Sequence, residues 1–428
     1  MPKISLSGPA ELLTVIPFHL GFQPRSSVVV VGFHGKRLGL LARLDVVPPE
    51  VAAEAAAQTV PTLLQDDPSS VALVAFEEEA DEAMPLLEAL ADAMEWDRVL
   101  VRERLVVRDG RWRSVGCDCC PDEGRLLPAQ ADVAAVADYV ALGHAVLPDR
   151  EGLARLVAPL SPGDPRHRGM SRAVDDWQRR YAAAGGRLLD RPDTSRPRRS
   201  GGGRGLTLLQ GGDPGDRRLL VDESLTAWAA VLHGAADAAD LHDLLPALVG
   251  PLRDVQVRDA LVGWLCPGSV PLQGFPEELL LLLAELLGPG LRLPSAAGDD
   301  DPLVDAWPGD LGDEPDEAFE ARARLDRLDA LDGADDVEDL EAAAALEGWD
   351  EAVASRLVLS RLEQVCRATP GAHAAPVLSV LASLAWWVGD GARAGVAVDQ
   401  ALELEPEHRL SLLVRQSLDH GIRPRRCA

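Results

Sequence analysis

The chain has 428 residues, a hydrophobic content of 47% and a formal net charge of −27. This acidity argues against nucleic acid as a partner, because phosphate binding needs lysine and arginine clustered over a broad face, and it also argues against an anionic membrane surface. The length predicts two or more domains. The longest apolar runs are too short to cross a bilayer, and the first residues lack the pattern of a signal peptide, so we expect a cytoplasmic protein.

Strand and helix patterns alternate in the first part of the chain. The two earliest strand patterns are separated by a short turn around Gly35, which predicts an antiparallel hairpin. The last two are joined by Asp109-Gly110, another hairpin signal. The order ββαβαββ predicts an α/β N-terminal domain with a mixed sheet. The segments are helix 9–20, strands 26–33 and 37–46, helix 49–65, strand 70–78, helix 81–96 and two strands within 98–115.

Helical patterns dominate the rest of the chain. Three predicted helices cover 128–143, 150–160 and 171–185. Pro, Gly and Arg then break all periodicity, which predicts a linker, and no strand signal follows it. We therefore expect an α/β domain with trailing helices over 1–186, an Arg/Gly/Pro-rich linker over 187–218 and an all-α C-terminal domain over 219–428.

The final segment contains a more specific helical pattern. Gly389, Ala394, Ala401 and Pro406 follow the spacing G-x4-A-x6-A-x4-P. Small alanines let two helices approach closely, and the proline ends the second helix before a third begins. This spacing is similar to a tetratricopeptide-type hairpin. Because only one such unit is clear, we expect a local tetratricopeptide-like helical hairpin and not a repeat array.

The stretch CDCC holds three cysteines in four positions, and its sequence leaves three interpretations open. Cys117, Cys119 and Cys120 can act as thiolate ligands, which makes zinc a possible cofactor, although no second CxxC pair completes the site. Cys119 and Cys120 can instead close a strained disulfide that is easily reduced. The third interpretation is a turn with small buried cysteines. Without a secretory signal, we expect reduced thiols.

Four further polar residues have local explanations. His19 lies on an apolar helix, which favours a core histidine over a catalytic base. His408 lies in the first turn of the last predicted helix, which predicts a contact at that helix end. Arg258 and Asp259 are adjacent on a helix, and we expect each to bind a different neighbouring helix in a buried ion pair.

Trp386 and Trp387 are the candidate partner-binding residues. They are adjacent on a predicted helix, so we expect one to pack in the core and the other to reach the surface. An exposed tryptophan in this position suggests a protein partner. The oligomeric state does not follow from this pattern.

Four stretches of the chain carry a resemblance to a known family. They are SGPAELLTVIPFHLGFQPRSSVVVVG, CDCCPDEG, VRDAL and AWWVGDGARAGVAVDQALELEPEHRLSLL. Together they resemble the actinobacterial family called domain of unknown function 4192. The resemblance implies no reaction, ligand or catalytic residue, because none is assigned to that family.

The sequence contains none of the common catalytic signatures HExxH, GxSxG and Walker A. With the helical hairpin and the acidity, this favours a cytosolic interaction or scaffold module without catalysis and with a protein partner. One alternative is a small-ligand-binding protein or enzyme with a site at the sheet edge near Gly32–Gly35 and the cysteine turn. Another alternative is a thiol- or metal-dependent regulator that uses the cysteines.

Overall fold

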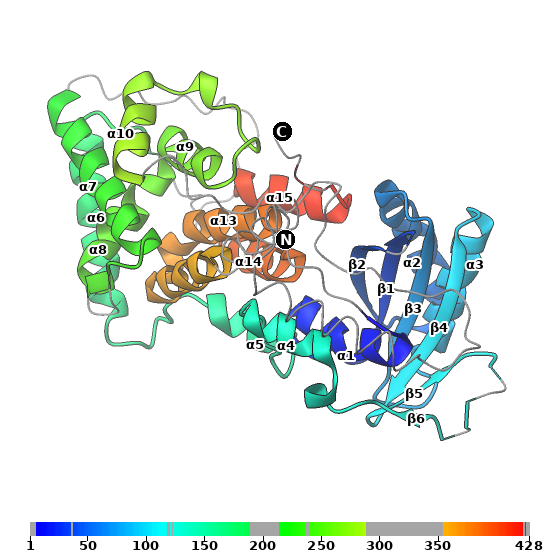
Figure 1. Ribbon diagram of the computed structural model, residues 1–428. Coiled ribbons are helices and arrows are strands. Elements are labelled where there is room, and N and C mark those ends of the chain that lie inside the picture. Colours follow the sequence, from blue (N-terminus) through cyan, green and yellow to red (C-terminus); the bar gives the residue numbers. More distant parts are fainter. Residues whose placement is uncertain are drawn as a thin grey trace, which may run out of the picture. The chain divides into compact units, whose positions relative to one another are not determined.

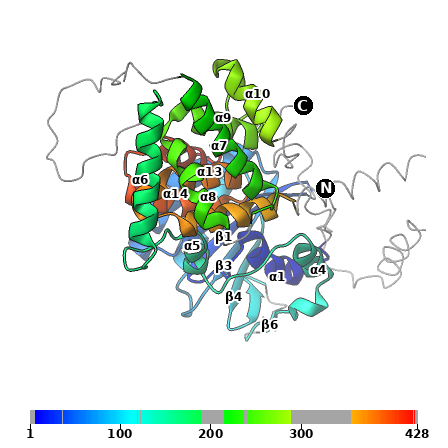
Figure 2. The same cartoon turned by 90° about the vertical axis from the view of Figure 1, so that its left-hand side faces the viewer.

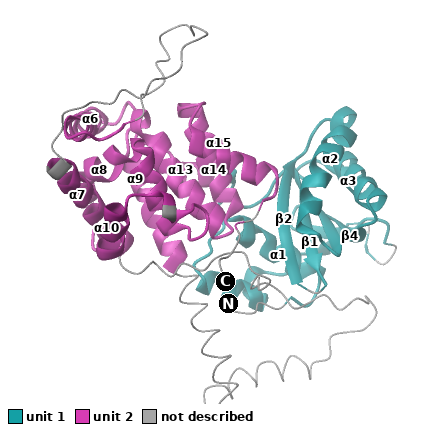
Figure 3. Ribbon diagram, turned by 90° about the horizontal axis from the view of Figure 1, so that it is seen from above, with its two compact units in different colours: residues 1–150, 299–353 teal, residues 151–298, 354–428 magenta. Residues whose placement is uncertain are grey.

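The computed structural model divides into two compact units (Figure 3). It describes residues 6–35, 37–117, 120–121, 123–188, 214–236, 240–287, 354–422 and 424. Among these, unit 1 comprises the residues up to Arg150, and unit 2 comprises those from Glu151 onward. Within the described ranges, every helix is too short or too polar to traverse a membrane.

Unit 1 is built on a six-stranded sheet with the order β2-β1-β3-β4-β5-β6 (Figure 1). Strands β3 and β4 are parallel, and all other neighbours are antiparallel, so the predicted mixed sheet is confirmed. The sixth strand is two residues long and has no pattern from which it could be predicted. The strands are β1 (Ser27–His34), β2 (Arg37–Asp45), β3 (Ser70–Phe76), β4 (Leu100–Arg108), β5 (Arg111–Ser114) and β6 (Arg125–Leu126).

The two central strands explain why the sheet is an interior element. Every residue of β3 is buried, and so is every residue of β1 except His34. Strands covered on both faces need this continuous apolar pattern. Helices α2 (Pro49–Leu63) and α3 (Met84–Trp96) cover one face of the sheet (Figure 3). Their side chains form a core there with Val28, Val30 and Leu73.

Two further helices complete the described part of unit 1. Helix α1 (Pro9–Leu20) packs on α4 (Ala134–Ala141). The rings of Phe18 and Tyr139 lie 6.1 Å apart at this contact. His144 Nδ1 lies 3.0 Å from the Phe18 carbonyl oxygen, which ties the chain after α4 to the end of α1.

Unit 2 contains helices and, among its described residues, no β-strand (Figure 2). Its central element is α13, in which every residue from His373 to Ala385 is buried. A helix that is apolar on all sides has to be covered on all sides, and α13 contacts α6, α8, α9, α14 and α15. The named helices are α5 (Arg150–Val157), α6 (His167–Ala183), α7 (Pro214–Leu232), α8 (Asp240–Val249), α9 (Val255–Leu265), α10 (Glu277–Leu287), α13 (Gly371–Trp387), α14 (Gly391–Leu404) and α15 (Arg409–Asp419).

The units divide near residue 150, not near the predicted boundary at 186. Helix α6 belongs to unit 2, because its buried face packs on α8 and on the short 3-10 helix η3 (Gly250–Arg253). Gln178 Nε2 donates to the Gly250 carbonyl oxygen over 3.2 Å. The sequence shows where α6 lies but not which helices cover its apolar face.

The predicted linker over 187–218 therefore joins two helices of one unit. The carboxylate of Asp254, at the start of α9, accepts hydrogen bonds from both sides of this stretch: from the Arg187 backbone N–H over 3.3 Å and from Arg217 Nη2 over 3.5 Å. The same carboxylate also accepts a hydrogen bond from the Tyr181 hydroxyl over 2.8 Å. Burial, with the Asp254 charge, raises the pKa of Tyr181 well above its usual value, so the hydroxyl stays a donor.

Candidate functional site

The outer face of α15 carries the most prominent apolar surface of the last three helices. Leu412 is 39% exposed and Leu413 is 60% exposed. Arg409 and Gln416 are also exposed. Together with the two leucines they occupy the i, i+3, i+4 and i+7 positions of one helical face. An apolar centre with a polar rim is the usual anatomy of a protein interface. Adjacent leucines on a short helix were the only sequence signal for this surface.

The start of α15 is held to the rest of unit 2 by His408. This residue caps the helix, since its Nδ1 accepts the Ser411 backbone N–H over 3.4 Å. The predicted helix-end contact is therefore confirmed. Its other ring nitrogen, Nε2, lies 3.5 Å from Arg258 Nη1 of α9. Burial, followed by the charges of Arg258 and Arg253, lowers the pKa of His408 to about 3, so the imidazole is neutral.

The prediction for Arg258 and Asp259 is wrong in part. We expected the two residues to bind different helices, but Arg258 Nη2 lies 2.7 Å from Asp259 Oδ1. The arginine side chain folds back along its own helix, and only its contact with His408 reaches another element. Nearby, Arg253 pairs with Glu405, which links η3 to the end of α14.

The two tryptophans lie in different environments. Trp387 is buried, and its Nε1 donates to the Pro267 carbonyl oxygen over 3.2 Å. Trp386 is half-buried, and its Nε1 donates to the Ile422 carbonyl oxygen over 2.8 Å. Trp387 is therefore a core residue, whereas Trp386 lies where α13 meets the end of the chain. A partner at either tryptophan stays a prediction.

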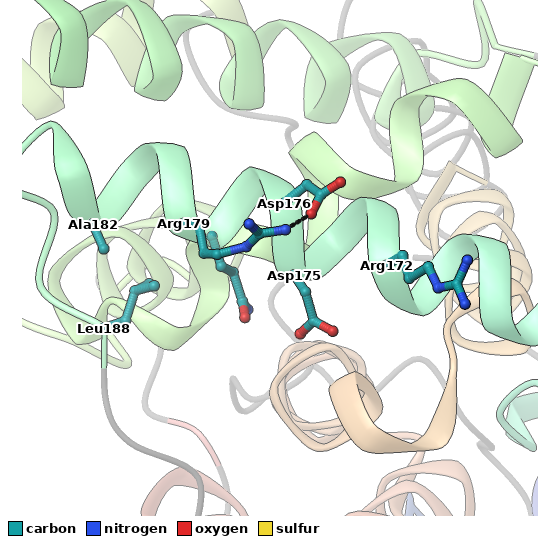
Figure 4. Close-up of a pocket in the computed structure, with 7 residues that line it drawn as sticks. Arg172, Asp175, Asp176, Arg179, Ala182 and Leu188 are labelled. Atoms are coloured by element: carbon teal, nitrogen blue, oxygen red, sulfur yellow. Dashed lines mark hydrogen bonds and ion pairs between the residues drawn. The ribbon is translucent and has the colours of Figure 1, made fainter.

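A pocket of about 500 Å³ runs along α6 (Figure 4). Four charged residues on one helical face line it: Arg172, Asp175, Asp176 and Arg179. Figure 4 shows that Arg179 pairs with Asp176, whereas Asp175 points away from this pair. The charges balance, so the pocket has no general preference for anions or cations.

A serine, a histidine and an aspartate meet beside this pocket. His373 is buried at the start of α13, and its Nε2 lies 3.3 Å from Ser171 Oγ and 3.5 Å from Asp175 Oδ1. In a nucleophilic triad the serine and the aspartate bind different ring nitrogens, so that one proton can be removed while the other is held. Here both bind Nε2. The arrangement therefore joins α13 to α6.

A second histidine–aspartate pair lies at the end of β1. His34 Nε2 is 3.0 Å from Asp66 Oδ2, which also accepts the Leu40 backbone N–H over 2.9 Å. Gly39 makes room for this contact, because a Cβ there would lie 2.8 Å from both side chains. His34 is exposed. This pair lies in the predicted sheet-edge region Gly32–Gly35, where a small-ligand site stays a prediction.

The cysteine turn connects β5 to β6. Cys117 is disulfide-bonded, so the expectation that all cysteines are reduced is corrected. Cys120 is free, which excludes the predicted Cys119–Cys120 disulfide. Cys119 lies outside the described residues, and the zinc site at Cys117, Cys119 and Cys120 stays a prediction. Among the residues that can be described, no cluster of three His, Cys, Asp or Glu side chains suits a metal ion. His19 is half-buried in the last turn of α1.

The family comparison covers almost all of these features. The family model described as Domain of unknown function (DUF4192) matches residues 9–297 and 311–425. No curated protein and no solved structure matches the chain. The matched ranges include the sheet, the cysteine turn, α6 and α15. The chain therefore belongs to the DUF4192 family of domains of unknown function.

Proposed function

We propose that this protein is an interaction module whose helical unit binds an amphipathic helix of another protein on the outer face of α15. The observation that carries the proposal is the exposure of Leu412 and Leu413 on the last helix of the unit. A helix face that stays exposed to water is normally polar. An apolar centre on the outer face of α15 therefore supports the proposal that another protein covers this face.

The packing of α13 on α14 supports the same function. Ala394 and Ala401 are fully buried between the helices, and Gly389 turns the chain between them with φ +86°. Pro406 follows α14 and precedes α15. This is the spacing of a tetratricopeptide-like hairpin, a unit that commonly builds protein-binding surfaces. We propose the likeness for this hairpin alone.

Charge indicates the chemistry of the partner helix. The chain has a net charge of −27, which attracts basic partners and repels acidic ones. At the end of α15, Asp419 Oδ1 lies 3.8 Å from Arg415 Nη1, so the acidity that a partner meets is that of the chain as a whole. A partner helix with leucine-like residues at i and i+3 or i+4, flanked by lysine or arginine, fits both the apolar centre and the acidic field.

The experiment is photo-crosslinking in cells that make the full chain. A crosslinking amino acid at Gln416 is expected to capture one partner protein, and capture is expected to fall strongly in the Leu412→Glu/Leu413→Glu variant. The matched control position is Leu219 of α7, which is 67% exposed in the same unit. Equal capture at both positions, capture that survives the double variant, or a product that contains only two copies of this chain would contradict the proposal.

A further inference from the structure

We infer that the pocket along α6 binds a short extended peptide that presents an acidic, a basic and an apolar side chain at alternate positions. The volume of the pocket is about 500 Å³, which is in the usual range for small-ligand sites. None of the residues on the outer face of α15 lines it. The peptide site is therefore separate from the interface proposed for α15 and does not depend on it.

The lining of the pocket changes from charged to apolar along the helix (Figure 4). Arg172 lies at one end and Asp175 in the middle. Ala182 and Leu188 form the other end. A ligand that fills the pocket therefore meets a cation, an anion and an apolar surface in this order.

Two charged groups of the pocket can bind a ligand. Arg172 is exposed, and within the described parts of the chain it has no carboxylate partner. Asp175 is half-buried, and its Oδ1 lies 3.5 Å from Nε2 of His373. A carboxylate has two oxygens with about four acceptor sites, so Asp175 can bind a cationic group in addition to its present contacts. The other two charges, Asp176 and Arg179, pair with each other.

The helix that carries these groups is held by the core of unit 2. Met170, Val174, Trp177 and Tyr181 are the buried residues of α6. They occupy one face at helical spacing, and the charged residues of the pocket occupy the opposite face. The backbone below the pocket is therefore fixed before a ligand arrives, which reduces the ordering that binding requires.

The spacing along α6 fits an extended chain. Ala182 follows Arg172 by ten residues, which correspond to about 15 Å of helix. In an extended peptide, alternate side chains point to the same side, and four residue steps cover about 14 Å. Side chains at positions i, i+2 and i+4 of a peptide laid along α6 can therefore reach Arg172, Asp175 and the apolar end. This predicts the order acidic, any residue, basic, any residue, apolar.

The test is calorimetric titration of the full chain with two synthetic peptides of equal composition. Glu-Ala-Lys-Ala-Leu has the predicted order, whereas Glu-Ala-Leu-Ala-Lys places the apolar side chain between the charges. We expect the first peptide to bind at least about fivefold more tightly, because only its basic and apolar groups both meet their partners. Both peptides are used with free ends and with acetylated and amidated ends. Binding of the capped form indicates a segment of a protein as the ligand, and binding of the free form alone indicates a free peptide.

Arg172→Glu tests the charge contact directly. This variant should bind Glu-Ala-Lys-Ala-Leu about fivefold more weakly than the wild type does, and it should bind Lys-Ala-Lys-Ala-Leu more tightly than the wild type does. The matched control is Arg168→Glu, one turn earlier on α6, because Arg168 is also exposed but does not line the pocket. That control should change the affinity by less than about twofold.

The Leu412→Glu/Leu413→Glu variant should bind the peptide like the wild type, which distinguishes a failure of this site from a failure of the α15 interface. The melting temperature of each variant shows that the chain is folded. Three results would each overturn the proposal: no heat of binding with either form of the peptide at millimolar concentration, equal affinity for the two peptide orders, or the same loss of affinity in Arg172→Glu and Arg168→Glu.

Discussion

At the residue scale, His408 shows how one buried side chain fixes the end of the helical unit. It caps α15 through Ser411 and contacts Arg258 of α9 through its other nitrogen. The cap needs a neutral imidazole, because Nδ1 must carry no proton to accept the Ser411 backbone N–H. The sequence predicted a contact at this helix end but placed His408 in the first turn, whereas the structure has it at the N-cap position. The second contact depends on which helices pack together, and the sequence does not contain that information locally.

This environment predicts a pH dependence of stability. The pKa of His408 falls from 6.5 in the unfolded chain to about 3 in the fold, so below pH 6.5 the unfolded state binds a proton that the folded state rejects. The free energy of unfolding should therefore decrease as the pH falls from about 6.5 to about 3, by at most about 1.4 kcal/mol per pH unit from this group. Urea unfolding followed by circular dichroism at several pH values measures it.

The matched pair of variants isolates this effect. His408→Gln should lower stability near neutral pH because the cap is altered, but it should remove the contribution of His408 to the pH slope, so its deficit relative to wild type should shrink and then reverse as the pH falls. His420→Gln changes an exposed histidine just beyond α15 and should retain the wild-type slope. A slope that is the same in wild type and His408→Gln would refute the assignment.

At the element scale, the contact between α6 and η3 holds the helical unit together. The Trp177 ring lies directly over Gly250, where a Cβ would be 2.3 Å from Trp177 Cε3. Trp177 is buried and also stacks on Tyr181 with ring centroids 5.2 Å apart, which restricts movement of the indole. This contact allows α6 to approach the rest of unit 2 closely.

Gly250→Ala should therefore destabilise unit 2. Overpacking of a filled contact typically costs about 1–3 kcal/mol, and urea unfolding of the full chain reports it. The control is Gly395→Ala in α14, where a new Cβ meets no atom within 4 Å. That change should leave stability unchanged or raise it by up to about 1 kcal/mol, because alanine favours a helix. Equal effects of the two substitutions would contradict the packing described here.

The elements themselves were largely predictable, and their packing was not. Apolar continuity identified β1 and β3, and helical periodicity identified α1 and α13. Strand β6 was missed because two residues carry no periodicity, and the contact between His34 and Asp66 was missed because it joins residues far apart in the chain. The only local signal of the contact between His34 and Asp66 was Gly39, a glycine within β2.

At the scale of the whole molecule, the chain combines a mixed sheet with a separate helical unit, as its two kinds of periodicity indicated. The boundary was misplaced because a Pro- and Gly-rich stretch looks the same whether it connects two domains or two helices of one domain. The bonds that Asp254 makes to Arg187 and Arg217 distinguish these cases. Function was the least predictable property, because it depends on which surfaces stay uncovered after folding.

The most direct test of the proposed interaction is the accessibility of α15 where the protein works. Leu413→Cys and, as the control, Leu219→Cys are labelled with a cell-permeant maleimide, in cells and after purification, and each site is followed by peptide mass spectrometry. A covered α15 predicts that position 413 is labelled several-fold more slowly in cells than in the purified protein, whereas position 219 changes little. The same ratio at both positions would show that no partner covers this face.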